Sequence, residues 1–107
     1  MSKYLFQANY LGGDGVKGLL KDGGSGRRAA VDQLFGSVGG RVEAFYYAFG
    51  ETDVFIIADL PDNASAAALA LKVSAGGLVT IRTTVLLTAE EVDQAAKKGV
   101  SYRPPGQ

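Results

Sequence analysis

The chain has 107 residues, enough for one domain with a single core. Eleven basic and eleven acidic side chains balance, so its charge gives no reason to expect a nucleic acid or an anionic membrane as partner. The absence of His and Cys excludes disulfides, thiolate nucleophiles, serine-histidine triads, and zinc or haem sites built on those side chains. We therefore expect no metal and no cofactor.

The first part of the chain predicts a strand and then an interrupted helix. Residues 3–10 alternate in a pattern typical of a strand. Apolar side chains then recur at helical spacing from residue 16 to about residue 38, but a glycine-rich stretch at residues 23–26 breaks the pattern. We expect a short helical turn, a kink, and a longer helix that begins near residue 25 or 27.

The middle of the chain predicts an antiparallel hairpin. Residues 41–49 are aromatic and apolar, residues 50–53 have the composition of a turn, and residues 54–60 form a second apolar run. Pro61 ends the second strand, and Asn63 or Ser65 is expected to cap the helix that follows.

The last part predicts a helix, a strand and a short helix. Residues 64–75 are alanine-rich, and residues 78–87 are rich in β-branched side chains, which favour a strand. Thr88 and Glu91 have the spacing of a capping box at the start of a helix that runs to about residue 98. We expect the tail, residues 100–107, to run extended, either frayed or reaching another subunit.

This order of elements predicts an α+β fold of the ferredoxin-like type, βαββαβ with a four-stranded antiparallel sheet and an added C-terminal helix, as a single domain over residues 1–107. The N-terminus lacks the pattern of a signal peptide, and the apolar runs are too short for a membrane span. We therefore expect a cytoplasmic protein.

Several segments resemble the GYD-domain family of small bacterial proteins, namely residues 4–10, 15–21, 39–50, 53–62 and 83–88. Where that family has Gly-Tyr-Asp, this chain has Glu51, Thr52 and Asp53, so only Asp53 carries over. The resemblance implies kinship with dimeric α+β barrel proteins, whose ferredoxin-like protomers pair sheet to sheet. That wider group includes cofactor-free monooxygenases, haem proteins and ligand-sensing domains, and the resemblance implies no single activity.

Alternation along the strands predicts a second sheet face that the helices leave uncovered. Its large apolar members are expected to be Phe45, Tyr47, Phe49, Phe55, Ile57 and Leu86. These are too many large apolar groups to leave in water, so we expect a homodimer or a higher homo-oligomer with opposed sheets.

The same face is predicted to carry the candidate ligand-binding residues Gln7, Asn9, Glu43, Tyr47, Asp59, Arg82 and Thr84. Three interpretations are open. In the first, Arg82 pairs with Glu43 or Asp59 and the polar groups are structural. In the second, Arg82 binds the carboxylate or enolate of a small ligand.

The third interpretation is catalysis, with Asp59 as a general base of raised pKa, Arg82 and Asn9 stabilising an oxyanion, and Tyr47 donating a proton. The sequence therefore predicts a homo-oligomer that binds a small organic ligand in a cavity between opposed sheets or serves as an assembly subunit. The alternative is a cofactor-independent enzyme, monooxygenase-like or isomerase-like, that acts on a small aromatic or keto acid.

Overall fold

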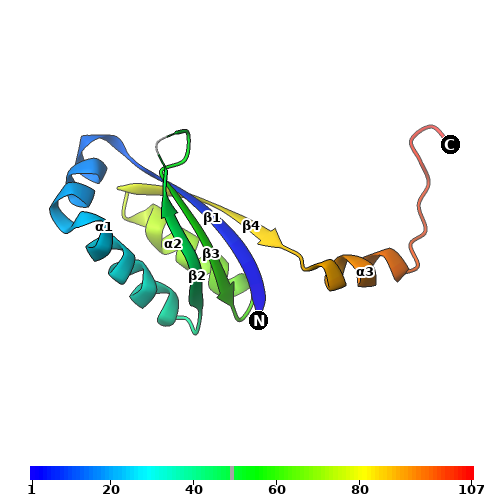
Figure 1. The fold of residues 1–107 in the computed structure, drawn as a ribbon. Helices are drawn as coiled ribbons and strands as arrows, with labels where there is room; N and C mark the ends of the chain where they lie inside the picture. Colours follow the sequence, from blue (N-terminus) through cyan, green and yellow to red (C-terminus); the bar gives the residue numbers. More distant parts are fainter. Residues whose placement is uncertain (49) are drawn as a thin grey trace.

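The chain forms a four-stranded antiparallel sheet with two helices on one face and a third helix beyond its end (Figure 1). A computed structural model describes residues 1–48 and 50–107. In chain order the elements are β1 (Ser2–Tyr10), α1 (Gly12–Gly36), β2 (Arg41–Tyr47), β3 (Val54–Leu60), α2 (Asn63–Ala75), β4 (Val79–Leu86) and α3 (Ala89–Lys97). The strand order β2-β3-β1-β4 confirms the predicted ferredoxin-like α+β fold.

The core lies between the sheet and helices α1 and α2. Strict alternation along β1 and β3 turns every second side chain toward the helices. These buried side chains are Tyr4, Phe6 and Ala8 on β1, and Val54, Ile56, Ala58 and Leu60 on β3. Phe35 of α1 meets Phe6 edge to face, with ring centroids 5.1 Å apart. This face of the sheet is therefore closed by the chain itself.

Helix α1 is bent at Gly23, as the glycine-rich stretch predicted. Gly23 has φ 75° and ψ 163°, a conformation that is nearly exclusive to glycine. The helix begins at Gly12, earlier than the expected residue 16, and the amide of Gly15 already bonds to the carbonyl of Leu11 at 3.0 Å. A Cβ on Gly15 would lie 2.6 Å from the carbonyl oxygen of Leu78, so this glycine permits close approach rather than a turn.

Helix α2 is capped by a residue other than the two expected. The side chain of Asp62 accepts a hydrogen bond from the amide of Ser65 at 2.8 Å, so the prediction of Asn63 or Ser65 as the cap was wrong. Asn63 instead accepts a bond from the buried Tyr4 hydroxyl at 2.6 Å. The helix start is thereby tied to the first strand.

Strand β2 contains an irregularity that changes which side chains face the helices. The pairing with β3 shifts between Val42 and Ala44, so that Phe45 lies opposite Ile56 and Tyr47 lies opposite Val54. Phe45 and Tyr47 therefore lie on the helix-covered side, and their predicted place on the uncovered face was wrong. Phe49, predicted there as well, lies outside the described residues.

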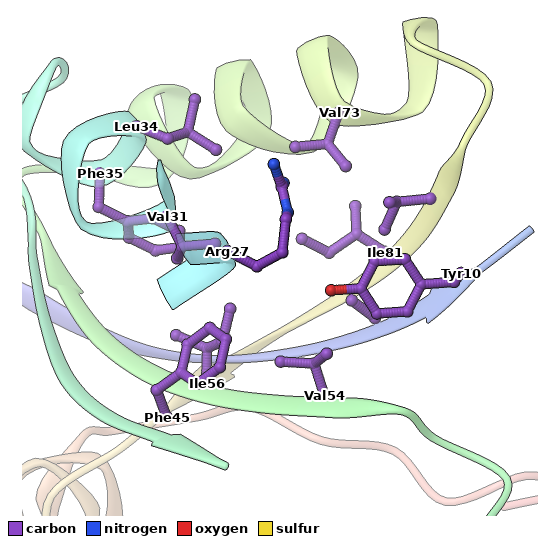
Figure 2. Close-up of a pocket in the computed structure, with 12 residues that line it drawn as sticks. Tyr10, Arg27, Val31, Leu34, Phe35, Phe45, Val54, Ile56, Val73 and Ile81 are labelled. Carbon is purple, nitrogen blue, oxygen red and sulfur yellow. The ribbon is translucent and has the colours of Figure 1, made fainter. Parts of the chain in front are cut away.

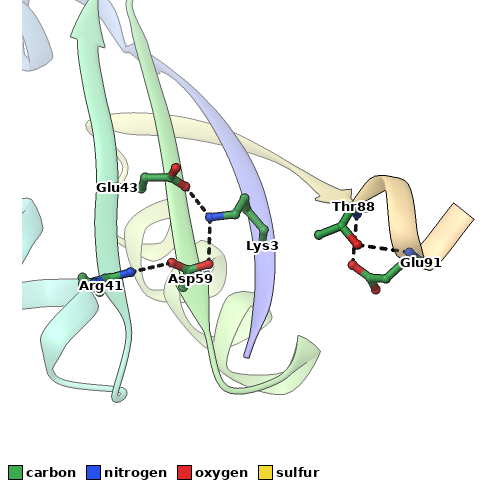
Figure 3. Close-up of polar contacts among 6 residues, drawn as sticks. All are labelled: Lys3, Arg41, Glu43, Asp59, Thr88 and Glu91. Carbon is green, nitrogen blue, oxygen red and sulfur yellow. Dashed lines mark hydrogen bonds and ion pairs between the residues drawn. The ribbon is translucent and has the colours of Figure 1, made fainter.

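Helix α3 and the tail extend away from the sheet (Figure 1). Thr88 and Glu91 form the predicted capping box, each side chain bonding to the other's backbone amide at 3.1 Å (Figure 3). Every residue from Leu87 to Gln107 is exposed, and the tail has no helix or strand. The radius of gyration is 17.0 Å, against about 13 Å for a compact domain of this length.

Candidate ligand-binding site

The uncovered side of the sheet, which we call the outer face, presents the odd-numbered side chains of β1 and the even-numbered side chains of β4. Gln7 lies opposite Arg82, Leu5 lies opposite Thr84, and Asn9 lies opposite Thr80. The pairing of β1 with β4 therefore brings four of the predicted site residues together on this face, namely Gln7, Asn9, Arg82 and Thr84. On the other side of β1, strand β3 adds Phe55, Ile57 and Asp59.

Thr52 and Asp53, which come just before β3, lie against one end of the outer face. A terminal nitrogen of Arg82 donates to the hydroxyl of Thr52 at 2.8 Å. That hydroxyl in turn donates to the side-chain oxygen of Gln7 at 3.2 Å. Thr52 is 6 % exposed, so this chain of bonds satisfies a buried hydroxyl.

Asn9 and Asp53 complete this polar end by bonding to the backbone. The amide of Asp53 donates to the Asn9 side chain at 2.8 Å, and the Asp53 carboxylate accepts from the amide of Tyr10 at 3.0 Å. Among the described residues, no buried side-chain nitrogen or oxygen lacks a partner. Gln7, Asn9 and Arg82 thus hold the turn against the sheet.

The sequence did not single out Thr52 as part of this end. One feature of the sequence could have pointed to it: Thr52 stands next to Asp53, at the position where the GYD family has a tyrosine. Here the side chain of Thr52 lies against Gln7 and Arg82. The turn itself, rather than the strands alone, therefore builds this part of the face.

Asp59 and Glu43 lie at the opposite end of the outer face, in an ion-pair network (Figure 3). Asp59 pairs with Lys3 at 3.0 Å and with Arg41 at 3.3 Å, and Glu43 also pairs with Lys3. The bond from Lys3 holds the pKa of Asp59 below its ordinary value of 3.8 despite partial burial. The bonds of Lys3 to Glu43 and then to Asp59 raise the pKa of Lys3. Asp59 is therefore a stable carboxylate rather than a base of raised pKa.

The predicted pairing of Arg82 with Glu43 or Asp59 does not form. Asp59 lies opposite Lys3 of β1, whereas Arg82 lies opposite Gln7, four positions further along that strand. At about 3.3 Å per residue this offset is about 13 Å, too long for a direct contact. The set required for the catalytic interpretation is not assembled by this chain.

Tyr47 lies apart from the other predicted site residues, on the helix side. Its hydroxyl donates to the carbonyl of Gly24 at 2.9 Å, next to the bend of α1. Burial, followed by the neighbouring Tyr10 hydroxyl, raises the pKa of Tyr47, so the hydroxyl stays protonated at neutral pH. Phe45 packs beneath Arg28, whose guanidinium lies 5.2 Å from the ring centroid.

A hollow lies between the sheet and the two helices (Figure 2). Its volume is about 70 Å³, and its walls are almost entirely apolar. Side chains of α1 and α2, among them Val31, Leu34 and Val73, face Ile56 and Ile81 of the sheet, and Arg27 and Tyr10 bring polar groups to it. The sequence analysis did not point to this site, because residue spacing does not show how closely α1 and α2 pack against the sheet.

The described residues contain no group of three or more carboxylates that could hold a metal ion. None of the helices that the structure describes is long and apolar enough to cross a membrane.

The chain falls in the class of small α+β proteins with a ferredoxin-like fold, in which helices cover one face of the sheet and leave the other uncovered. Within that class the chain matches the GYD domain over residues 4–96, and it belongs to that family. The match includes the turn that carries Thr52 and Asp53 and extends through most of α3. No match was found among curated proteins or among solved structures.

Proposed function

We propose that this GYD-family chain is a self-associating subunit whose outer sheet face is covered by a second copy. The observation that carries the proposal is the apolar middle of that face, where Leu5 of β1 lies beside Ile57 of β3 and Phe55 lies opposite Tyr46 of β2. Phe55 is 37 % exposed and Tyr46 is 71 % exposed. A contiguous patch of this kind is typical of a protein interface.

The ends of the outer face suit a second copy of the same chain. At one end, Lys3 and Arg41 balance Glu43 and Asp59, so two identical faces can approach without net repulsion. At the other end, Thr52 and its partners satisfy one another. Because these polar groups need no external partner, the geometry favours an assembly subunit over a ligand cavity between the opposed sheets.

The outer face of the sheet is smaller than a typical interface, which supports a contribution of α3 to the contact between copies. Four strands of about eight residues present about 500 Å² per copy at ordinary strand spacing. A typical specific interface buries about 800 Å² per partner. Helix α3 follows β4 directly and exposes Val92, and a helix of nine residues is marginal in water without a surface to pack on. We include α3 in the proposed contact between copies.

Sedimentation or light scattering of the wild type and two matched variants tests this proposal. Phe55→Asp puts a carboxylate into the apolar middle of the outer face, and we expect the dissociation constant of self-association to rise about a hundredfold or more. Leu20→Asp is the control, because Leu20 is an exposed apolar residue of α1 on the other side of the sheet, and it should leave the mass unchanged.

A wild type that remains a folded monomer at high micromolar concentration would refute the proposal. So would an unchanged mass for Phe55→Asp. Circular dichroism of each variant distinguishes loss of association from loss of fold.

A further inference from the structure

Three adjoining hollows surround Tyr10 on the helix side of the sheet. The apolar hollow of about 70 Å³ and a second of about 130 Å³ share Tyr10, Arg27 and Val79 as walls. A third, of about 280 Å³, lies beneath the first half of α1, with Tyr10 and Leu19 as walls that it shares with the second. Packing around Tyr10 is thus looser than in the rest of the helix-covered side.

Among the residues that the structure describes, Arg27 is the one cation that lines the apolar hollow. Figure 2 shows its guanidinium between the two helices, pointing toward the part of the wall formed by Val73. Its side chain is 34 % exposed, so the charge is partly removed from water. An apolar chamber with a guanidinium at its wall is complementary to a small molecule with one anionic end and one apolar end.

The pair with Asp22 uses only part of the hydrogen-bonding capacity of the Arg27 guanidinium. Its ion pair with Asp22 has a nitrogen-oxygen distance of 3.5 Å, longer than the 2.7–2.9 Å of a strong charged hydrogen bond. An arginine carries five N–H donors in a planar fork that fits a carboxylate with two parallel bonds. The hydroxyl of Tyr10 points into the same hollow and offers a further donor (Figure 2).

The size of the hollow selects the apolar end of the ligand. An engineered cavity of about 150 Å³ holds benzene in a dry protein core. The hollow between α1, α2 and the sheet has about 70 Å³, which suits a chain of a few carbons better than a phenyl ring. Walls formed by Val31, Leu34 and Ile81 offer such a chain contacts without a polar group to satisfy.

We propose that this hollow binds a short-chain aliphatic carboxylate, with the carboxylate on Arg27 and the carbon chain among the apolar side chains of α1, α2 and β4. Tyr10 orients the carboxylate from the sheet. The site lies on the opposite side of the sheet from the proposed contact between copies. Binding of the acid therefore does not depend on self-association.

A titration series followed by two-dimensional NMR of the full chain tests the proposal. Acetate, propionate and butyrate should bind progressively tighter, by about fourfold for each added methylene, because each buried methylene contributes about 0.8 kcal/mol. Affinity should stop rising once the chain outgrows the hollow. Benzoate should bind no tighter than butyrate, and uncharged isobutanol should bind more weakly than butyrate.

Two variants locate the site. Arg27→Gln should weaken butyrate binding about tenfold or more, because it replaces a charged donor pair with a neutral amide. Arg28→Gln is the matched control, because Arg28 is not among the residues that line the hollow and it pairs with Asp32, and it should leave binding nearly unchanged. Val73→Phe fills the chamber from α2 and should weaken butyrate by a similar factor.

The proposal is overturned if the folded wild type binds none of these acids or binds them without dependence on chain length. Equal affinity in the wild type and Arg27→Gln would overturn it as well. If Val73→Phe does not fold, Ile81→Phe fills the hollow from the sheet and takes its place. Measurement on Phe55→Asp, which should bind butyrate like the wild type, separates this result from the fate of the self-association proposal.

Discussion

The two faces of the sheet are made from alternate residues of the same strands, yet they are stabilised differently. Phe6 on the covered face is completely buried against Phe35, whereas its neighbour Leu5 on the outer face stays partly exposed. The covered face is mostly apolar and has a hollow beside Arg27. The outer face has bonded polar ends and an apolar middle. The chain thus covers one face of the sheet with its own helices and leaves the other face uncovered.

The largest expected difference between the two faces is in the stability cost of truncating Phe6 and Leu5, which are neighbours on β1. Phe6→Ala should lower the free energy of unfolding by about 3–5 kcal/mol, because it leaves a cavity among Tyr4 and Phe35 that the core closes only in part. Leu5→Ala should cost much less in the dilute monomer. Urea unfolding of both variants at low protein concentration measures the difference, and equal costs would contradict the division into a closed and an open face.

At the polar end of the outer face, Thr52→Val keeps the shape of the side chain and removes the hydroxyl. The change leaves Gln7 and Arg82 without their shared partner and should cost about 1–2 kcal/mol in urea unfolding. Thr84→Val is the matched control, because Thr84 is an exposed threonine on the same face, and its change should be nearly neutral. A neutral Thr52→Val would show that the turn is held by Asn9 and Asp53 alone.

The smallest effect is expected at the charged end. Because the folded pKa of Asp59 lies below its ordinary value of 3.8, its ion pairs stabilise the fold fully above about pH 4 and lose that contribution as the pH falls through the folded pKa. Asp59→Asn should therefore cost about 1 kcal/mol at neutral pH. Its urea midpoint should approach that of the wild type as the pH falls below 4.

The control for this comparison is Asp32→Asn, which removes a more exposed carboxylate paired with Arg28 on α1. It should change the urea midpoint less than Asp59→Asn does at neutral pH. A difference between Asp59→Asn and the wild type that persists undiminished in acid would contradict a stabilising role for the ionised carboxylate.

Local patterns predicted most of the fold because they act over short stretches of chain. Alternation located the strands, and the glycine at the bend of α1 and the pair Thr88 and Glu91 acted where they were expected. Alternation failed for strand β2, because one register shift between Val42 and Ala44 reverses the faces of the residues that follow. Alternation cannot locate such a shift, so Phe45 and Tyr47 were given to the wrong face.

The candidate site was less predictable than the fold, because it depends on register between strands distant in the sequence. Gln7 and Arg82 were correctly given one face, and their alignment follows from the pairing of β1 with β4. Asp59 shares that face, but the pairing of β1 with β3 sets it beside Lys3 instead. The face on which a side chain lies follows from alternation within its own strand. Its neighbours on that face depend on the register between paired strands.

By itself, the sequence determined the order of elements, the absence of histidine and cysteine chemistry, and an uncovered sheet face with apolar groups. Residue types and periodicity are sufficient for these because each depends on composition or on a few successive residues. Only the tertiary structure decided that Thr52 joins Gln7 and Arg82, that Lys3 holds Asp59, and that Arg27 lines a hollow in the core. These depend on strand register and on how closely helices pack against the sheet, which are set by the sum of many contacts across the fold.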